Sequence, residues 1–195
     1  MVMAGAQEWG SFTTTAGRRP ISELSLKLSP LDLVTHWGRC GIVADLMASY
    51  FAYNFENAAG AQNDISTALN ELVENIGKFS SDPMIAVTAS VVHYADFVCI
   101  TTENVTNAAR AAELASIMEE LVSQDLDDLF SAQVERTVAS SEAISRLGLL
   151  MLMKDHKAQL GVRISPCPAS DLSEVVVQVS LDVEGIENVD GDEPP

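Results

Sequence analysis

Residues 65–82 combine an amphipathic helical pattern with polar side chains of chemically useful types. At about 100° per residue, the apolar positions gather in one arc roughly 120° wide, which predicts the face that packs into the core. The residues of this arc are Ile65, Leu69, Leu72, Val73, Ile76 and Phe79.

The polar residues of the same helix divide into two groups. Glu71, Asn75 and Lys78 fall together on one flank of the apolar arc, whereas Asn70 and Glu74 are expected to point to the far side. Glu71 and Asn75 are i, i+4 neighbours at the edge of the core. A carboxylate and a carboxamide held there have the chemistry of a general base and of an oxygen ligand for magnesium. On spacing alone, a core helix with a solvated charged flank is the alternative.

The stretch LNELVENIGKFS, residues 69–80, resembles the N box of the GHKL superfamily of Bergerat-fold ATP binders. This superfamily includes histidine kinases, the ATPase subunits of type II topoisomerases and stand-alone anti-sigma-factor serine kinases. The resemblance implies that Asn75 holds Mg²⁺ across the triphosphate of ATP and that Glu71 stands at the catalytic-base position. It also implies that Lys78 is among the nucleotide-binding residues.

A second match lies at residues 145–164, where SRLGLL resembles the Gly-Leu-Gly-Leu box of the same superfamily, followed by a helix and a Gly-containing turn. Glycine there permits a backbone amide to approach a phosphate closely at a helix N-terminus. The resemblance implies that Leu147, Gly148 and Leu149 line the nucleotide site. A glycine that merely accommodates packing in an apolar helix is the alternative.

The chain departs from the superfamily where an Asp-x-Gly-x-Gly box is expected, because residues 101–107 read TTENVTN. No glycine occurs between Lys78 and Leu147, so a flexible, glycine-hinged lid is not expected. Asn104 is the candidate for the polar contact to the nucleotide that the superfamily's aspartate makes. Alternatively, Asn104 belongs to a turn before a helix that Thr106 or Asn107 caps.

The elements around these motifs predict an α/β fold, a Bergerat-like two-layer sandwich in which helices cover one face of a mixed, largely antiparallel sheet. Strands are expected at residues 21–28, 84–92, 96–102, 160–165 and 174–183, and helices at 30–53, 107–122, 126–138 and 142–159. The helix at 30–53 presents Trp37, Ile42, Leu46, Tyr50 and Phe51, and we expect its aromatic residues to be core residues rather than a binding box.

The chain has 195 residues, of which 47% are hydrophobic, and a formal net charge of −17. This predicts a mobile N-terminus at 1–20, a single GHKL-like ATP-binding domain at 21–183, and an acidic disordered tail at 184–195. The charge argues against nucleic-acid and membrane partners. The absence of a signal-peptide pattern favours the cytoplasm. The three histidines and three cysteines match no metal-binding spacing.

The retained N box, missing Asp-x-Gly-x-Gly box and reduced Gly-Leu box together resemble a divergent branch of the superfamily that includes the SiaB-type bacterial regulator kinases. The resemblance implies an Mg-ATP-dependent serine/threonine kinase that acts in partner switching on a small STAS-like antagonist protein. The alternative is a catalytically inactive GHKL-like module that regulates a protein partner by association. A homodimer is left open.

Overall fold

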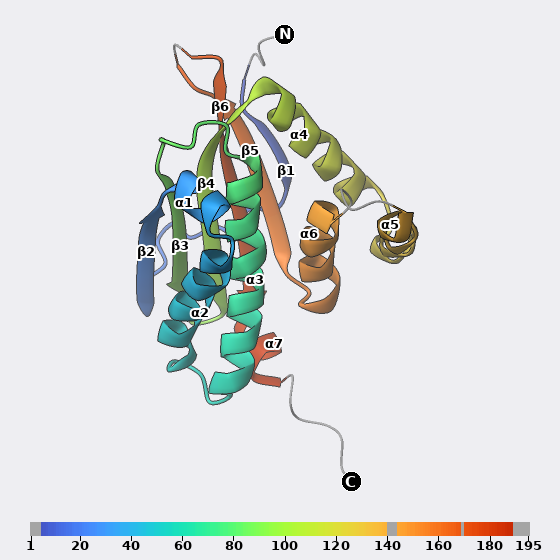
Figure 1. The fold of residues 1–195 in the computed structure, drawn as a ribbon. Coiled ribbons are helices and arrows are strands. Elements are labelled where there is room, and N and C mark those ends of the chain that lie inside the picture. Colours follow the sequence, from blue (N-terminus) through green and yellow to red (C-terminus); the bar gives the residue numbers. More distant parts are fainter. Residues whose placement is uncertain (1–4, 140–143, 169, 189–195) are drawn as a thin grey trace.

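The computed structural model describes residues 5–139, 144–168 and 170–188, with the side chains of 133–139 and 144–147 left aside. Figure 1 labels its elements along the chain. They are β1 (Gln7–Gly10), β2 (Ser22–Leu28), α1 (Pro30–Thr35), α2 (Gly38–Ala52), α3 (Ala58–Phe79), β3 (Val87–His93), β4 (Phe97–Asn107), α4 (Ala108–Ser123), α5 (Leu126–Ala139), α6 (Ile144–Asp155), β5 (Gln159–Pro166), β6 (Leu172–Asp182) and α7 (Val183–Asn188).

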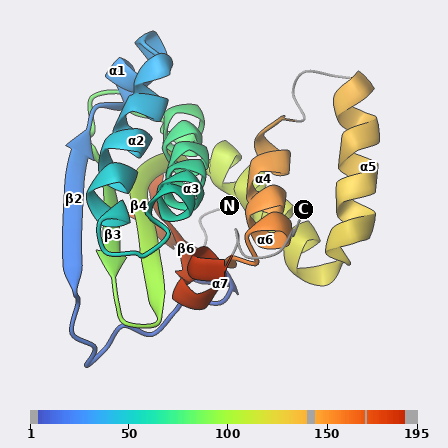
Figure 2. The ribbon, with the colours of Figure 1, turned by 90° about the horizontal axis from the view of Figure 1, so that it is seen from below.

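The strands form a six-stranded sheet in the order β1-β5-β6-β4-β3-β2, and each neighbouring pair is antiparallel. Figures 1 and 2 show the helices gathered on one face of this sheet, with α2 and α3 lying along it and α5 farthest from it. The predicted two-layer α/β architecture is therefore confirmed.

The core lies between the sheet and α3. In β4, the even-numbered residues Val98 and Ile100 are fully buried and join the same apolar cluster as α3. The arc predicted on α3 is confirmed, because Ile65, Leu69 and Leu72 are fully buried and Val73 and Ile76 are at most 1% exposed. Phe79, at the end of the helix, is half-buried. One face of β4 and the apolar arc of α3 thus cover each other.

The N-terminal segment is tied to the sheet, although no element was predicted before residue 21. Strand β1 pairs with β5, and the chain that follows it runs across the sheet face opposite the helices. There the backbone N–H of Thr13 donates to Oε1 of Gln178 at 2.7 Å, and Arg18 forms a 2.6 Å ion pair with Asp96. Residues 1–4 lie outside the described part of the chain.

The helix predicted at residues 30–53 is two helices, with a break between Thr35 and Gly38. The expectation that its aromatic residues are core residues holds for Phe51, which is buried, and is wrong for Trp37 and Tyr50, which are 40% and 53% exposed. Ile42 and Leu46 are also exposed, at 67% and 60%. Helix α2 instead buries a face built mainly from small residues, which brings it close to its neighbours.

The end of the chain also differs from expectation, because residues 183–188 form the short helix α7 and Ile186 is 2% exposed. Residues 189–195 of the predicted acidic tail lie outside the described residues.

Gly10 provides a test of the N-terminal attachment. Its φ is 68°, and a Cβ there would overlap the carbonyl oxygen of Leu160. We expect Gly10→Ala to lower the free energy of unfolding by about 1–3 kcal/mol, measured by equilibrium denaturation. Gly5→Ala is the matched control, since a Cβ at Gly5 meets nothing within 4 Å. Equal stability of the two variants would contradict the placement of β1 against β5.

Candidate functional site

Helix α3 carries the predicted N box and is fixed at both ends. At its start, the side chain of Asn57 accepts a 2.9 Å hydrogen bond from the N–H of Gly60, which caps the helix. At its end, the hydroxyl of Thr106 donates to the carbonyl oxygen of Phe79 at 2.6 Å. The N–H of Ser81 also donates to the carbonyl oxygen of Val105 at 3.1 Å. The C-terminal end of α3 is therefore held against the end of β4.

The two sequence motifs meet at Glu71 and Gly148. A Cβ built on Gly148 would overlap Oε2 of Glu71, so the carboxylate lies directly against the backbone of α6. Gly148 is the fifth residue of α6 and buried, rather than a residue in front of the helix. Leu149 is 4% exposed and belongs to the core. Leu147 lies in α6, but its side chain is outside the described part.

Burial is the main influence on the acidity of Glu71. The carboxylate is half-buried, and loss of solvation raises its pKa. The negative charge of Glu74 raises this pKa further, while the positive charge of Lys78 opposes the shift. Within the described residues, no side chain donates a hydrogen bond to this carboxylate. A raised pKa and an unbonded carboxylate are properties expected of a general base.

Glu74 and Lys78 differ from the sequence expectation. Nζ of Lys78 lies 3.3 Å from Oε2 of Glu74 and 5.5 Å from the centre of the Trp37 ring. Asn70 donates to the other carboxylate oxygen of Glu74 at 3.1 Å. The charge of Lys78 acts on Glu71 as the expected grouping implies. The expected separation of Lys78 from Glu74 is wrong, because Lys78 lies between the two carboxylates in helical phase and its long side chain turns to Glu74.

Asn75 and Asn104 each contain a buried polar atom with no hydrogen-bond partner among the described residues, namely Oδ1 of Asn75 and Nδ2 of Asn104. Buried polar atoms in native proteins are nearly always bonded, so such atoms mark candidate ligand contacts. Asn104 lies within β4 rather than in a turn, on the helix-facing side of the strand with Thr102 and Thr106.

The capping alternative for this region is confirmed at Asn107, whose side chain accepts a 3.0 Å hydrogen bond from the N–H of Arg110 at the start of α4. Asn107 caps α4, and Asn104 lies within the strand before it. The side chain of Asn104 is turned into the layer that contains α3.

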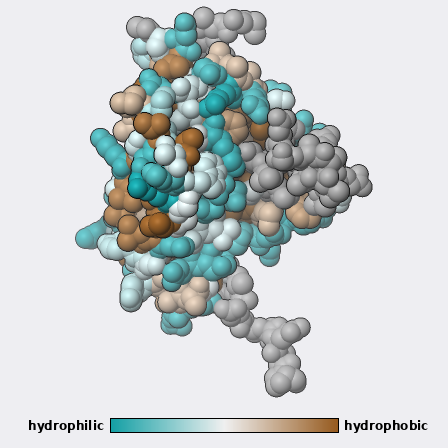
Figure 3. All heavy atoms as spheres, viewed as in Figure 1, coloured by the Kyte–Doolittle hydropathy of each residue, from teal (hydrophilic) through white to brown (hydrophobic). Residues whose placement is uncertain are grey.

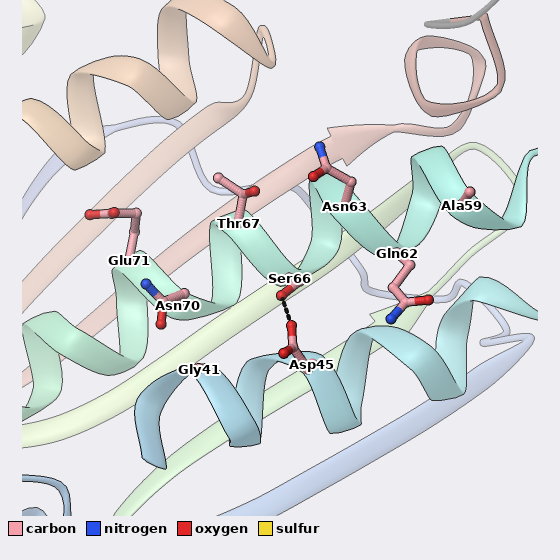
Figure 4. Close-up of a pocket in the computed structure, with 9 residues that line it drawn as sticks. All are labelled: Gly41, Asp45, Ala59, Gln62, Asn63, Ser66, Thr67, Asn70 and Glu71. Atoms are coloured by element: carbon pink, nitrogen blue, oxygen red, sulfur yellow. Dashed lines mark hydrogen bonds between the residues drawn. The ribbon is translucent and has the colours of Figure 1, made fainter. Parts of the chain in front are cut away.

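A surface groove of about 530 Å³ is lined by residues of α2 and α3, among them Gly41 and Asp45 on α2 and Glu71 on α3. Figure 4 shows Asn70 and Ser66 turned towards α2, with Ser66 bonded to Asp45, whereas Glu71 and Thr67 point to the opposite side of α3. The lining is polar and includes Asp45 and Glu71 but no lysine or arginine. The groove alone therefore lacks the cations that would attract a phosphate.

A partly buried pair of titratable residues was not predicted from the sequence. Nδ1 of His156, in the turn after α6, lies 3.3 Å from Oδ1 of Asp64 on α3. Asp64 is 7% exposed, and its hydrogen bond raises the pKa of His156 against the opposing effect of burial. The pair ties the end of α6 to the first half of α3. The two residues are too far apart in sequence for any local pattern to pair them.

Comparison with solved structures shows a similarity of fold. No family model matches the sequence, and no curated protein matches it. The fold is similar to a chain of a crystal structure of the SiaB–SiaC complex from Pseudomonas aeruginosa, with a TM-score of 0.57 and 14% sequence identity. The match covers 86% of this chain and 94% of the other. At this identity the similarity establishes the fold. Within the described residues, no helix has both the length and the apolar character needed to cross a membrane.

The donor set at α3 fits a magnesium ion bound together with a nucleotide. Carboxylate and carboxamide oxygens are ligands that Mg²⁺ accepts, and it usually keeps water and phosphate oxygens as its remaining ligands. The buried, unpartnered Oδ1 of Asn75 supplies such an oxygen. The described residues contain no cluster of three or more His, Cys, Asp or Glu that would hold a metal alone.

The burial of Glu71 predicts a pH-dependent stability change. Because its pKa is higher in the folded state than its ordinary value near 4.5, the charged carboxylate disfavours folding once pH rises above that value. We expect Glu71→Gln to raise Tm at pH 7.5, and this gain to shrink towards zero as pH falls below about 4.5, where Glu71 becomes protonated in both states. Thermal unfolding at the two pH values measures the effect. Glu103→Gln, at an exposed position on β4, is the control; a Glu71→Gln variant less stable than wild type at pH 7.5 would contradict the assignment.

Proposed function

We propose that this chain is a regulatory protein of a partner-switching system that binds Mg-ATP at α3 and phosphorylates a serine or threonine of a small STAS-like protein. The observation that carries the proposal is the pairing, one helical turn apart, of a half-buried Glu71 with an Asn75 whose Oδ1 is buried and unpartnered. The N-box resemblance assigns these two positions to base and magnesium ligand. The proposal places the chain in the cytoplasm.

The proposed roles follow from the groups at each position. Glu71 accepts the proton of the partner's hydroxyl as that oxygen bonds to the γ-phosphorus of ATP and the bond to the leaving ADP breaks. Asn75 would hold Mg²⁺ through Oδ1, and the bound ion would supply positive charge against the phosphates. Asn104 offers Nδ2 as a donor to the nucleotide base. Gly148 leaves room beside Glu71, while Leu147, Leu149 and Lys78 complete the expected nucleotide-binding set.

A protein partner is supported by the fold similarity, since the similar chain was crystallised in a complex of two proteins, SiaB and SiaC. A STAS-like partner is the class that the N-box resemblance favours. In such an arrangement the partner supplies the nucleophile, and the kinase supplies the nucleotide and the base.

The alternative function is a catalytically inactive module that regulates its partner by association. Two observations favour it. The glycine expected to approach phosphate is instead packed against Glu71, and an asparagine inside a strand stands near the place of the adenine-binding aspartate. Nucleotide titration and phosphoryl transfer separate the two functions.

Asn75 is the position that tests nucleotide binding. We expect wild-type protein to bind ATP in the presence of Mg²⁺, and Asn75→Ala to weaken that affinity at least about tenfold, as loss of a metal-site contact does. Isothermal titration calorimetry with and without Mg²⁺ measures this. Asn63→Ala, at an exposed position on the same helix, is the matched control and should bind like wild type. Absence of wild-type binding at millimolar ATP would refute the ATP site and favour the inactive module.

Glu71 is the position that tests catalysis. Because general-base catalysis contributes about 10²–10⁴-fold, Glu71→Gln should lower phosphoryl transfer by that factor while ATP affinity changes little. The measurement is transfer of labelled γ-phosphate to a purified STAS-like partner. Glu103→Gln is the control. A Glu74 variant would not serve, because the charge of Glu74 acts on Glu71. Equal transfer by Glu71→Gln and wild type would show that Glu71 is not the base.

A further inference from the structure

Helix α2 is apolar on both of its sides. Its inner face is buried and includes Met47 and Phe51, both with no exposed surface. Its outer face is also apolar, whereas the outer face of a surface helix ordinarily carries the charged residues. A helix that is hydrophobic all round is normally covered on all sides. We call the exposed residues of its outer face the α2 ridge: Ile42, Leu46, Tyr50 and Tyr53.

The α2 ridge has the spacing of a helix-packing surface. Its residues follow one another at i, i+4, i+8 and i+11, which places them within about 80° of arc. Their exposed fractions are 67%, 60%, 53% and 92%. Figure 3 shows apolar surface gathered over α1 and α2 on this face of the molecule. Rows of side chains at i±4 spacing pack into the grooves of a second such row at a crossing angle near −50°.

Charged residues are few on the segment that forms this face. The chain has a net charge of −17, but residues 30–53 contain only Asp32, Arg39 and Asp45 as charged residues. Arg39 is ion-paired with Asp32, and Asp45 accepts a hydrogen bond from Ser66 on the side of α2 next to α3. Two copies of a strongly acidic chain repel each other wherever their acidic surfaces meet. The α2 ridge is a face on which two copies meet with little repulsion.

The exposed apolar area is of the size that an interface needs. Leu31, Val34 and Trp37 extend the apolar surface beyond the α2 ridge, with exposed fractions of 51%, 56% and 40%. With large side chains of about 150–250 Å² each, these residues and the ridge leave on the order of 900 Å² of side-chain surface in water. One side of a standard protein interface buries about 800 Å².

We propose that the α2 ridge is the interface with a second copy of this chain, in a two-fold symmetric dimer whose α2 helices cross. A two-fold interface uses the same surface on both subunits, so a self-complementary apolar ridge suffices to form it. Leu46 lies at the middle of the i±4 row and so faces the Leu46 of the second copy. A basic protein partner is less suited to this face, because the face offers almost no acidic side chains for it to pair with.

The test is the oligomeric state of the full chain, measured by light scattering coupled to size exclusion and by analytical ultracentrifugation. We expect wild-type protein to be a dimer at tens of micromolar. Leu46→Glu should raise the dissociation constant of the dimer at least about 100-fold, because two carboxylates would be buried against each other. Leu46 is 60% exposed in the subunit, so circular dichroism should show an unchanged fold.

A charge-reversed pair and a distant apolar control complete the design. Mixing Leu46→Glu with Leu46→Lys should restore a dimer that contains one copy of each, as expected only if position 46 faces itself. Val122→Glu, at an exposed position on α4 (49%), should remain dimeric. A monomeric wild type at 100 µM, a dimer unaffected by Leu46→Glu, or failure of the mixture to pair would each overturn the proposal. None of these readouts depends on ATP binding.

Discussion

The approach of the Glu71 carboxylate to the backbone of Gly148 is the contact on which the rest of the site depends. It fixes how near α6 lies to α3, because any side chain at position 148 would occupy the space that the carboxylate fills. It also withdraws the carboxylate from water, which raises its pKa and readies it to accept a proton. The Asp64–His156 pair reinforces this arrangement by joining the end of α6 to α3 about two helical turns away.

The charge distribution gives the molecule two very different faces. Around α3, Glu71 and Glu74 lie near one lysine, Lys78, which is already paired with Glu74. An anionic nucleotide would therefore depend strongly on Mg²⁺ to offset the carboxylates. On the outer side of α2 the acidic residues give way to exposed apolar ones. The first face suits a cation-dependent ligand, and the second suits another protein surface.

Much of the fold could be predicted because its strongest periodicities are unambiguous. The apolar arc of α3 and the short apolar runs that become β3, β4, β5 and β6 each point to one type of element. The buried face of helix α2 could not be predicted from periodicity. Because this helix carries apolar residues on two opposite sides, the pattern does not show which side faces the core. Asn104 was hard to assign because the stretch TTENVTN, residues 101–107, does not alternate apolar and polar residues as a half-buried strand does. In the structure the even-numbered residues of this stretch nevertheless face α3. The contacts of Glu71 with Gly148 and of Asp64 with His156 depend on tertiary packing, which no local pattern encodes.

The central claim is that Glu71, Asn75 and Gly148 surround one metal-nucleotide site, and paramagnetic NMR tests it most directly. Mn²⁺ takes the same oxygen ligands as Mg²⁺ and broadens the signals of nearby nuclei. In the presence of ATP and substoichiometric Mn²⁺, we predict the strongest broadening at the side-chain amide of Asn75 and the backbone amides of Glu71 and Gly148, with the amide of Asp96, before the far end of β4, least affected. Broadening confined to exposed acidic residues elsewhere, with the Asn75 signals unchanged, would contradict the account.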